Sequence, residues 1–235
     1  MQNNIICEIT NLINIHGMVS IAGESGSGKT TLAYQLMGNM IALPYCKSSL
    51  WIQASEHFSL KRFSIMFEGY PEKLNYLKKN VFVVPARGTF RSYDEQCNFV
   101  GKISNNETIL PLDLKCIVID NISHHLRREI SNTLDIKARV SILNDFFSSQ
   151  LVPLFLFCRK NLICLMLIHE FTYDPGLNKN VPFFYKLYER TKSLEIMLTK
   201  QFNSSVREMK LSGANLNRSY RYTLNDDGFR FSENY

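Results

Sequence analysis

A glycine-rich segment near the start of the chain has the residue types and spacing that bind phosphate. Gly23-x4-Gly28 is followed directly by a lysine and a threonine. Glycines let the backbone curl so that successive N–H groups converge on phosphate oxygens. A lysine at this place reaches the β- and γ-phosphates, and the threonine hydroxyl can ligate magnesium. The predicted site for ATP and Mg2+ comprises Gly23, Glu24, Ser25, Gly26, Ser27, Gly28, Lys29, Thr30 and Thr31.

An apolar run and a helical pattern flank this segment, as a phosphate-binding loop requires. Residues 18–22 have the composition of a buried strand, and 30–41 continue as a helix whose positive end adds to phosphate binding. Because Lys29 would neutralise phosphate charge at close range, we expect it to act in catalysis as well as in binding.

The second half of the predicted site is a carboxylate at the end of the apolar run 116–120. An aspartate at the C-terminal edge of a parallel sheet lies beside the phosphate loop and can hold magnesium through water. We therefore assign Asp120 to the magnesium site with Thr30; its alternative role is to begin a turn. Glu56, beyond another apolar run, is the best candidate to orient the attacking water. The alternative is that Ser55 and Glu56 only begin a helix.

Apolar runs and helical patterns alternate along the chain and would position these residues. The continuous apolar runs are typical of strands that are buried on both faces. This β-α-β-α order predicts an α/β fold with a mainly parallel twisted sheet and helices on both faces. Strands are predicted at 17–22, 49–54, 80–84, 116–120 and 162–168. Helices are predicted at 29–42, 58–68, 71–79, 91–103 and 135–160.

The pattern changes after residue 190. Short runs of alternating apolar and polar residues occur at 193–199, 205–211 and 219–224. The segments that separate them, and 225–228 after the last of them, have residue types typical of hairpin turns. They predict an antiparallel C-terminal extension of the same sheet. No Pro-, Gly- or Ser-rich linker divides the chain, so we expect a single domain over residues 1–235.

The composition is that of an ordinary globular protein, with 45% hydrophobic and 20% charged residues. The net charge of +6 suits a polyanionic partner, although lysine and arginine are spread along the chain. Scattered cysteines and an N-terminus without a basic segment favour a reduced, cytoplasmic location, or a nuclear one in a eukaryote. The uninterrupted apolar stretches are too short to span a bilayer, so no membrane association is expected.

Several segments resemble the RecA-type recombinase ATPases, and especially short paralogues of the archaeal RadB and RadC type. The segment 51–62 is similar to the family's Tyr-Ile-Asp-Thr-Glu-Gly-x-Phe-x-x-x-Arg stretch, with Phe58 and Arg62 in register. The segment 221–229 resembles the family's closing hairpin. The resemblance implies a RecA-like P-loop core over about residues 16–232, and it implies that Arg62 packs against the adenine ring.

The same register exposes two departures from the family. The family's catalytic glutamate falls on Ser55, so either Glu56 serves after a one-residue shift or hydrolysis is slow. At the end of the run 165–168, His169 and Glu170 replace the polar amide pair that ends the family's sensor strand, so sensing of the γ-phosphate can differ.

Two absences narrow the predicted function. The phosphate loop begins at residue 23, so the family's helical N-terminal DNA-binding domain is not expected before it. The Phe-x-x-Ala element, by which full recombinases dock onto their neighbours, does not occur in the sequence. A self-assembling strand-exchange filament is therefore not expected.

In RecA-type cores, two loops after the fourth and fifth strands face DNA. The first would be 122–129, where Arg127 and Arg128 suit phosphate contacts from a mobile loop. The second would be 171–180, which offers aromatic side chains for base stacking and Lys179. Alternatively, the first is only a solvated connection, and the aromatic side chains of the second fold back onto the core.

The leading hypothesis is an ATP-binding recombinase paralogue that assists DNA repair by homologous recombination. It would bind single-stranded DNA, a recombinase or paralogue partner, or both, and hydrolyse ATP slowly. One alternative is a P-loop kinase for a small molecule, which would need an arginine-rich lid but not the antiparallel tail. The other alternative is a KaiC-type regulatory ATPase, or a binding subunit whose ATP site only gates a partner interaction.

Overall fold

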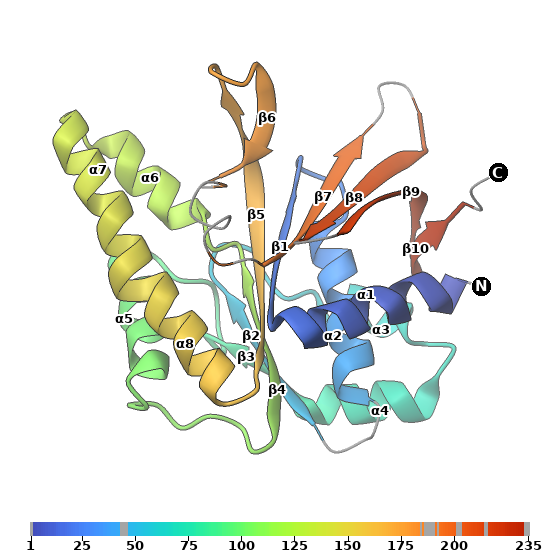
Figure 1. Cartoon of the computed structure of the whole chain (residues 1–235). Helices are drawn as coiled ribbons and strands as arrows, with labels where there is room; N and C mark the ends of the chain where they lie inside the picture. The colour runs from blue at the N-terminus through green and yellow to red at the C-terminus, as the bar shows by residue number, and fades with distance from the viewer. Residues whose placement is uncertain are drawn as a thin grey trace.

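A central sheet with helices on both sides forms the chain (Figure 1). The computed structural model describes residues 2–42, 47–183, 185, 191, 193–200, 204–213 and 216–232. The strands are β1 Met18–Gly23, β2 Ser48–Gln53, β3 Val81–Val84, β4 Leu114–Asp120, β5 Cys164–Asp174, β6 Lys179–Pro182, β7 Leu194–Lys200, β8 Arg207–Gly213, β9 Leu216–Asn225 and β10 Gly228–Phe231. The helices are α1 Gln2–His16, α2 Lys29–Ala42, α3 Leu60–Met66, α4 Pro71–Asn80, α5 Tyr93–Ser104, α6 His124–Asn132, α7 Ile136–Asp145, the π-helical η1 Phe146–Leu151 and α8 Val152–Lys160.

The order of strands in the sheet is β10-β9-β8-β7-β1-β5-β4-β2-β3, and β6 pairs with β5. Strands β7, β1, β5, β4, β2 and β3 lie parallel to one another, and β8, β9 and β10 continue the sheet from β7 in antiparallel pairing. This arrangement confirms the predicted α/β class and the antiparallel C-terminal extension. Because β1, β5 and β4 are parallel neighbours, their C-terminal ends meet at one edge of the sheet.

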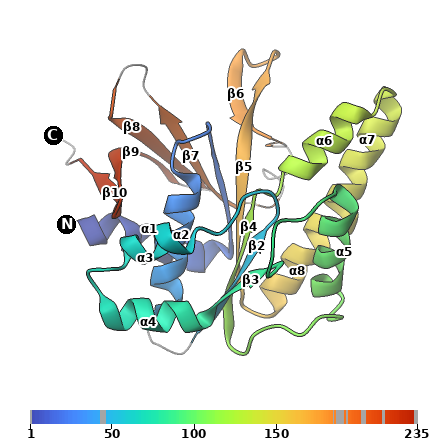
Figure 2. The ribbon, with the colours of Figure 1, turned by 180° about the vertical axis from the view of Figure 1, so that it is seen from behind.

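The buried core consists of two clusters, one on each face of the sheet. Helices α1 to α4 cover one face, and α5, η1 and α8 cover the other, as the view from behind in Figure 2 also shows. Within β5, Leu165 and Leu167 face the α5–α8 side, whereas Met166 and Ile168 face the α2 side. Since both faces are apolar, the strand is a continuous apolar run in the sequence.

The prediction of a DNA-facing loop at 122–129 is wrong, because helix α6 occupies most of this segment. The Asn121 side chain accepts hydrogen bonds from the N–H and hydroxyl of Ser123, at 2.9 and 2.7 Å, and so shapes the turn that leads into α6. Burial of Leu126 anchors the helix to the α5–α8 cluster. Arg127 and Arg128 therefore lie on a helix.

The second predicted DNA-facing loop, 171–180, is mostly a β-hairpin. Strand β5 continues to Asp174 and returns as β6, and the Asp174 side chain accepts a hydrogen bond from the Gly176 N–H at 2.8 Å within the turn. Tyr173 is exposed near the tip and does not fold back onto the core. The hairpin projects from the same edge of the sheet as the phosphate loop (Figure 1).

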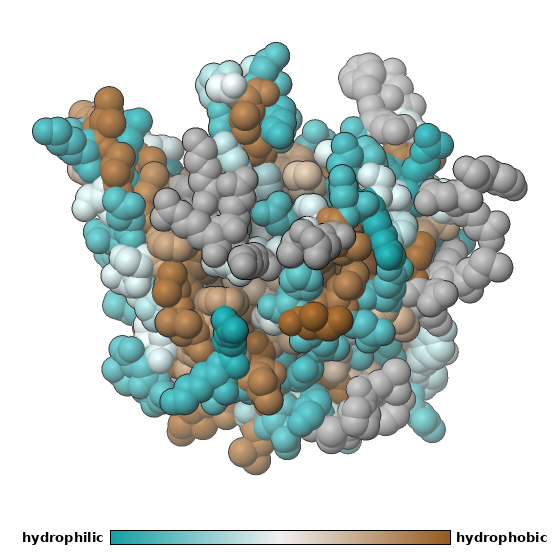
Figure 3. Space-filling model, in the orientation of Figure 1, coloured by the Kyte–Doolittle hydropathy of each residue, from teal (hydrophilic) through white to brown (hydrophobic). Residues whose placement is uncertain are grey.

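The stretch Ile136–Lys160 is long and apolar enough, by length and composition, to cross a membrane. It comprises α7, η1 and α8, and its inner side packs on the sheet through residues such as Phe146 and Leu154. Ile136 and Val140 of α7 are exposed apolar residues. Apolar side chains gather at the left in Figure 3, where α7 lies in Figure 1. Among the described residues, no other helix meets this criterion.

Candidate nucleotide-binding site

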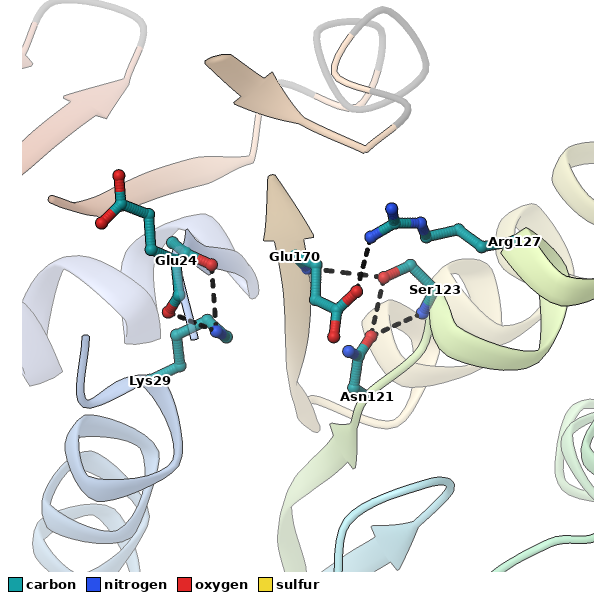
Figure 4. A network of polar contacts seen from close by, with 7 residues as sticks. Glu24, Lys29, Asn121, Ser123, Arg127 and Glu170 are labelled. Atoms are coloured by element: carbon teal, nitrogen blue, oxygen red, sulfur yellow. Dashed lines mark hydrogen bonds and ion pairs between the residues drawn. The ribbon is translucent and has the colours of Figure 1, made fainter. Parts of the chain in front are cut away.

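The glycine-rich segment connects β1 to the first turn of α2. Gly28 has a φ of +102°, which a glycine adopts without strain. A Cβ atom on Gly23 would come within 2.6 Å of the Leu198 carbonyl oxygen, so a larger residue does not fit there. The Lys29 Nζ donates hydrogen bonds to the carbonyl oxygens of Gly23 and Glu24, both at 2.9 Å (Figure 4). The loop is therefore wrapped around a lysine ammonium.

The other residues of the loop differ in how a phosphate could reach them. Ser25 and Gly26 are exposed at the loop's apex. Ser27 and Thr31 are buried, and their hydroxyl groups have no hydrogen-bond partner among the described residues. Because Thr31 is fully buried, its contact with phosphate stays a prediction.

Thr30 and Asp120 lie together, as predicted for a magnesium site. The Thr30 hydroxyl donates a hydrogen bond to Asp120 Oδ2 at 2.8 Å. Mg2+ prefers oxygen ligands and is usually held by one or two protein groups together with phosphates and water. This pair fits that requirement, and no group of three or more possible metal ligands was found among the described residues.

The charges around Lys29 are mainly negative. Burial lowers the pKa of Lys29, whereas Glu170, Asp120 and Glu56, in decreasing order of effect, act to raise it. Burial also raises the pKa of Asp120 to about 7, although the Thr30 hydrogen bond acts to lower it. A phosphate group entering this site would meet Lys29 and several carboxylates, with Lys200 as a further cation close enough to act on the pKa of Lys29.

The predicted water-orienting residue, Glu56, follows β2 at the same edge of the sheet. The main-chain N–H groups of Ala54 and Ser55 donate to the Asp120 carbonyl oxygen, at 2.7 and 3.2 Å, and hold this segment against the end of β4. The Glu56 side chain is exposed and close enough to Asp120 to act on its pKa. Its role in hydrolysis stays a prediction.

Arg62, the predicted adenine contact, is an exposed residue of α3. Its N–H donates to the hydroxyl of Ser59, which caps the helix, and the Ser59 N–H donates to the Tyr34 hydroxyl at 2.9 Å. Phe58 packs against the Tyr34 and Trp51 rings, with centroids 5.0 and 5.4 Å apart. These contacts fix the start of α3; the adenine contact itself stays a prediction.

The C-terminal sheet holds the phosphate loop through contacts that the sequence did not predict. The Arg207 guanidinium donates to the Gly26 carbonyl oxygen at 2.8 Å, and the Tyr222 hydroxyl donates to the Ser27 carbonyl oxygen at 2.7 Å. Burial raises the pKa of Tyr222, so its hydroxyl remains a donor at neutral pH. Tyr222 lies in the segment 221–229 that resembles the closing hairpin, but that resemblance does not indicate a contact with the loop, and Arg207 belongs to no motif.

A second polar network lies beside the loop and joins α6 to the end of β5 (Figure 4). Arg127 donates to Glu170 Oε2 at 2.5 Å, and its guanidinium lies 5.4 Å from the centroid of the Phe183 ring. The Glu170 N–H donates to the Ser123 hydroxyl at 3.5 Å. The sequence marked Glu170 as unusual and Arg127 as a phosphate contact, but it did not predict that they form a pair.

The other two predicted DNA contacts are exposed. Arg128 follows Arg127 on α6, and Lys179 begins β6. Helix α6 and the β5–β6 hairpin extend from the same edge of the sheet (Figure 1). The three basic residues thus lie on two neighbouring projections of that edge, and their contact with DNA stays a prediction.

Comparisons with known proteins agree with this architecture. No family model matches the chain. It is similar to the DNA repair protein RAD57 of Saccharomyces cerevisiae, with 29% identity over 134 residues; the match covers 50% of this chain and 26% of that protein, about a quarter of its length. The crystal structure of the RadB recombinase matches with a TM-score of 0.66 and 23% identity, covering 92% of this chain and 90% of that chain. The resemblance to RecA-type recombinase paralogues is confirmed.

Proposed function

Because the chain resembles the RecA-type recombinase paralogues in sequence and in fold, we propose that it is an ATP-binding paralogue that assists DNA repair by homologous recombination. The observation that carries the nucleotide part is the position of Lys29 and the Thr30–Asp120 pair at one edge of the sheet. The similarity to RAD57 supports the role in DNA repair.

In this proposal, the main-chain N–H groups of the loop and Lys29 bind the phosphates of ATP. Thr30 would ligate Mg2+ directly and Asp120 through water, and the bound ion would supply positive charge against the phosphates. Arg207 and Tyr222 hold the loop carbonyls, so the loop is kept in its curled form before nucleotide arrives. Arg62 packs against the adenine ring.

We expect slow hydrolysis, because a serine stands at the family's catalytic position and Glu56 is an exposed side chain. The Glu56→Gln variant should keep its affinity for ATP and lose the remaining turnover, since the amide cannot accept a proton from water. Phosphate release measured with saturating ATP and Mg2+ tests this, and wild-type turnover should lie well below the ~10 s⁻¹ median for enzymes. The exposed Glu68→Gln is a matched control. Equal turnover in wild type and Glu56→Gln would exclude Glu56 from this role.

DNA binding is the second part of the proposal, and it runs through α6 and the β5–β6 hairpin. Arg127, Arg128 and Lys179 are the basic residues that these two projections offer to a phosphate backbone. The kinase alternative requires an arginine-rich lid over the phosphates. It is less well supported, since Arg127 and Arg128 lie on helix α6 and not on a lid loop.

The variant Arg127→Ala with Arg128→Ala is expected to weaken binding of single-stranded DNA for all sequences, because phosphate contacts carry no base information. The slope of log affinity against log salt should flatten by roughly 0.7 for each DNA phosphate that the variant no longer neutralises. Fluorescence anisotropy with a labelled thymidine oligonucleotide, at several salt concentrations and with or without ATP and Mg2+, measures both quantities.

The matched control is Lys78→Ala with Lys79→Ala, another adjacent and exposed pair, on α4. It removes the same net charge from a helix that does not project beside the phosphate loop. If the arginine variant keeps the affinity and the salt slope of the wild type, α6 does not contact DNA. A regulatory ATPase that binds a protein partner would then be the better proposal.

A further inference from the structure

Glu170 lies at the edge of the sheet beside the phosphate loop. Strands β1 and β5 are parallel neighbours, and Gly23, the first residue of the phosphate loop, is in register with Glu170. On its other side, β5 pairs with β4, which ends at Asp120. Figure 4 shows the Glu170 side chain between Lys29 and Arg127. The carboxylate thus lies beside the phosphate loop, between the loop lysine and Arg127.

This carboxylate interacts with the loop lysine itself. Of the three carboxylates that act on Lys29, Glu170 has the largest effect, ahead of Asp120. An ammonium that binds the last two phosphates of a triphosphate therefore has a fixed negative charge beside it. That charge repels a γ-phosphate more than a β-phosphate, because Coulomb repulsion grows as the distance falls. A diphosphate avoids most of this repulsion.

Arg127 supplies the counter-charge, and its position is built from several contacts. It pairs with Glu170 Oε2 at 2.5 Å and lies over the Phe183 ring. The Phe183 N–H in turn donates to the Glu170 main-chain carbonyl oxygen at 3.1 Å, so the backbones that carry the ring and the carboxylate are joined. The side chains of Arg127 and Glu170 are 37% and 41% exposed, so water screens the pair in part.

We propose that Glu170 sets the preference of the site between ADP and ATP, and that Arg127 permits a triphosphate to bind by neutralising it. This inference rests on the proposed nucleotide-binding function. When Glu170 and Arg127 are paired, the net charge of the pair beside the γ-phosphate is close to zero. Without Arg127, the same neighbour carries a full negative charge. An anion that draws Arg127 away from Glu170 would therefore favour ADP over ATP.

The test compares dissociation constants for ADP and for a non-hydrolysable ATP analogue, measured by calorimetry with Mg2+. Glu170→Gln should tighten binding of the triphosphate roughly tenfold and change that of ADP by less than about twofold, because only the γ-phosphate meets the charge that the substitution removes. Arg127→Gln should weaken binding of the triphosphate by roughly the same factor. The double variant should return the ratio of the two constants to within about threefold of the wild type.

Two kinds of control variant show whether a change in the ratio of dissociation constants comes from the charge of the pair or from a change in structure. Arg127→Lys keeps the charge and should keep the ratio near the wild-type value. Glu129→Gln on α6 and Lys137→Gln on α7 remove the same charges from exposed positions and should leave the ratio unchanged. The ADP constant of each variant reports whether its site is intact.

Two results would overturn the inference. One is an equal change in the ADP and triphosphate constants for Glu170→Gln. The other is a ratio that does not respond to Arg127→Gln. If the wild-type protein itself binds neither nucleotide, the proposed function fails as well. If the wild type binds both and the ratio does not move, only the role of Glu170 and Arg127 fails.

Discussion

Replacing Lys29 with alanine is expected to raise the dissociation constant for ATP by at least about 100-fold, which is about 2.7 kcal/mol. The ammonium is the cation inside the curled loop, where it holds the carbonyl oxygens of Gly23 and Glu24. Its removal leaves Asp120 and Glu56 beside the phosphates without the lysine charge, and Glu170 is then offset by Arg127 alone. The variant loses an attraction to phosphate and also exposes phosphate to repulsion.

A titration with a fluorescent ATP analogue in the presence of Mg2+ measures this loss. Lys47→Ala is the control: Lys47 is a partly exposed lysine that pairs with Asp113 on the surface. It should bind nucleotide as the wild type does. Circular dichroism of Lys29→Ala shows whether the fold is kept. Unchanged affinity in a folded Lys29→Ala protein would exclude this loop as the ATP site.

The sheet could be predicted because its parallel strands are continuous apolar runs and because the phosphate-loop pattern fixes where β1 ends. Helix α1 was missed, although Ile6, Ile9 and Ile13 recur at helical spacing and are buried. Helix α6 was missed for a different reason. It begins with two histidines and contains two adjacent arginines, so its helical state depends on burial of Leu126 against another part of the chain.

The sequence predicted those site residues that belong to a short motif or that follow from a general rule of parallel sheets. Lys29 and Thr30 belong to one motif, and Asp120 follows from the rule that strand ends of a parallel sheet meet at one edge. Tyr222, in contrast, reaches the loop from 195 positions away. The pair of Arg127 and Glu170 depends on the order of the strands, which places the end of β5 beside both the loop and α6. A pattern of residues that are neighbours in the sequence predicts neither the Tyr222 contact with the loop nor the Arg127–Glu170 pair.

Asp120→Asn is expected to stabilise the protein without nucleotide at pH 8 and to remove most of the stabilisation by ATP and Mg2+. Burial raises the pKa of Asp120 from its ordinary 3.8 to about 7. The folded state therefore binds a proton more readily than the unfolded state does. The contribution of this group to stability is fully present below pH 3.8 and is lost as the pH rises through 7.

The size of the effect follows from the same shift. At pH 8 the buried carboxylate destabilises the folded wild type by up to roughly 4 kcal/mol, since each pKa unit corresponds to about 1.36 kcal/mol. At pH 5 the folded carboxylate is mostly protonated, so the difference between variant and wild type should fall by more than half. Urea unfolding of both proteins at the two pH values, without Mg2+ and nucleotide, measures the difference.

The surface variant Asp113→Asn is the control and should change the free energy of unfolding by less than about 0.5 kcal/mol at either pH. When the unfolding is repeated with ATP and Mg2+, the ligands should raise the free energy of unfolding of the wild type by more than that of Asp120→Asn. The reason is that the carboxylate can bind Mg2+ and the amide lacks its charge. An equal difference between Asp120→Asn and wild type at pH 5 and pH 8 would contradict the raised pKa. A carboxylate that destabilises the empty site and stabilises the loaded one is a binding group, since its burial alone does not favour the fold.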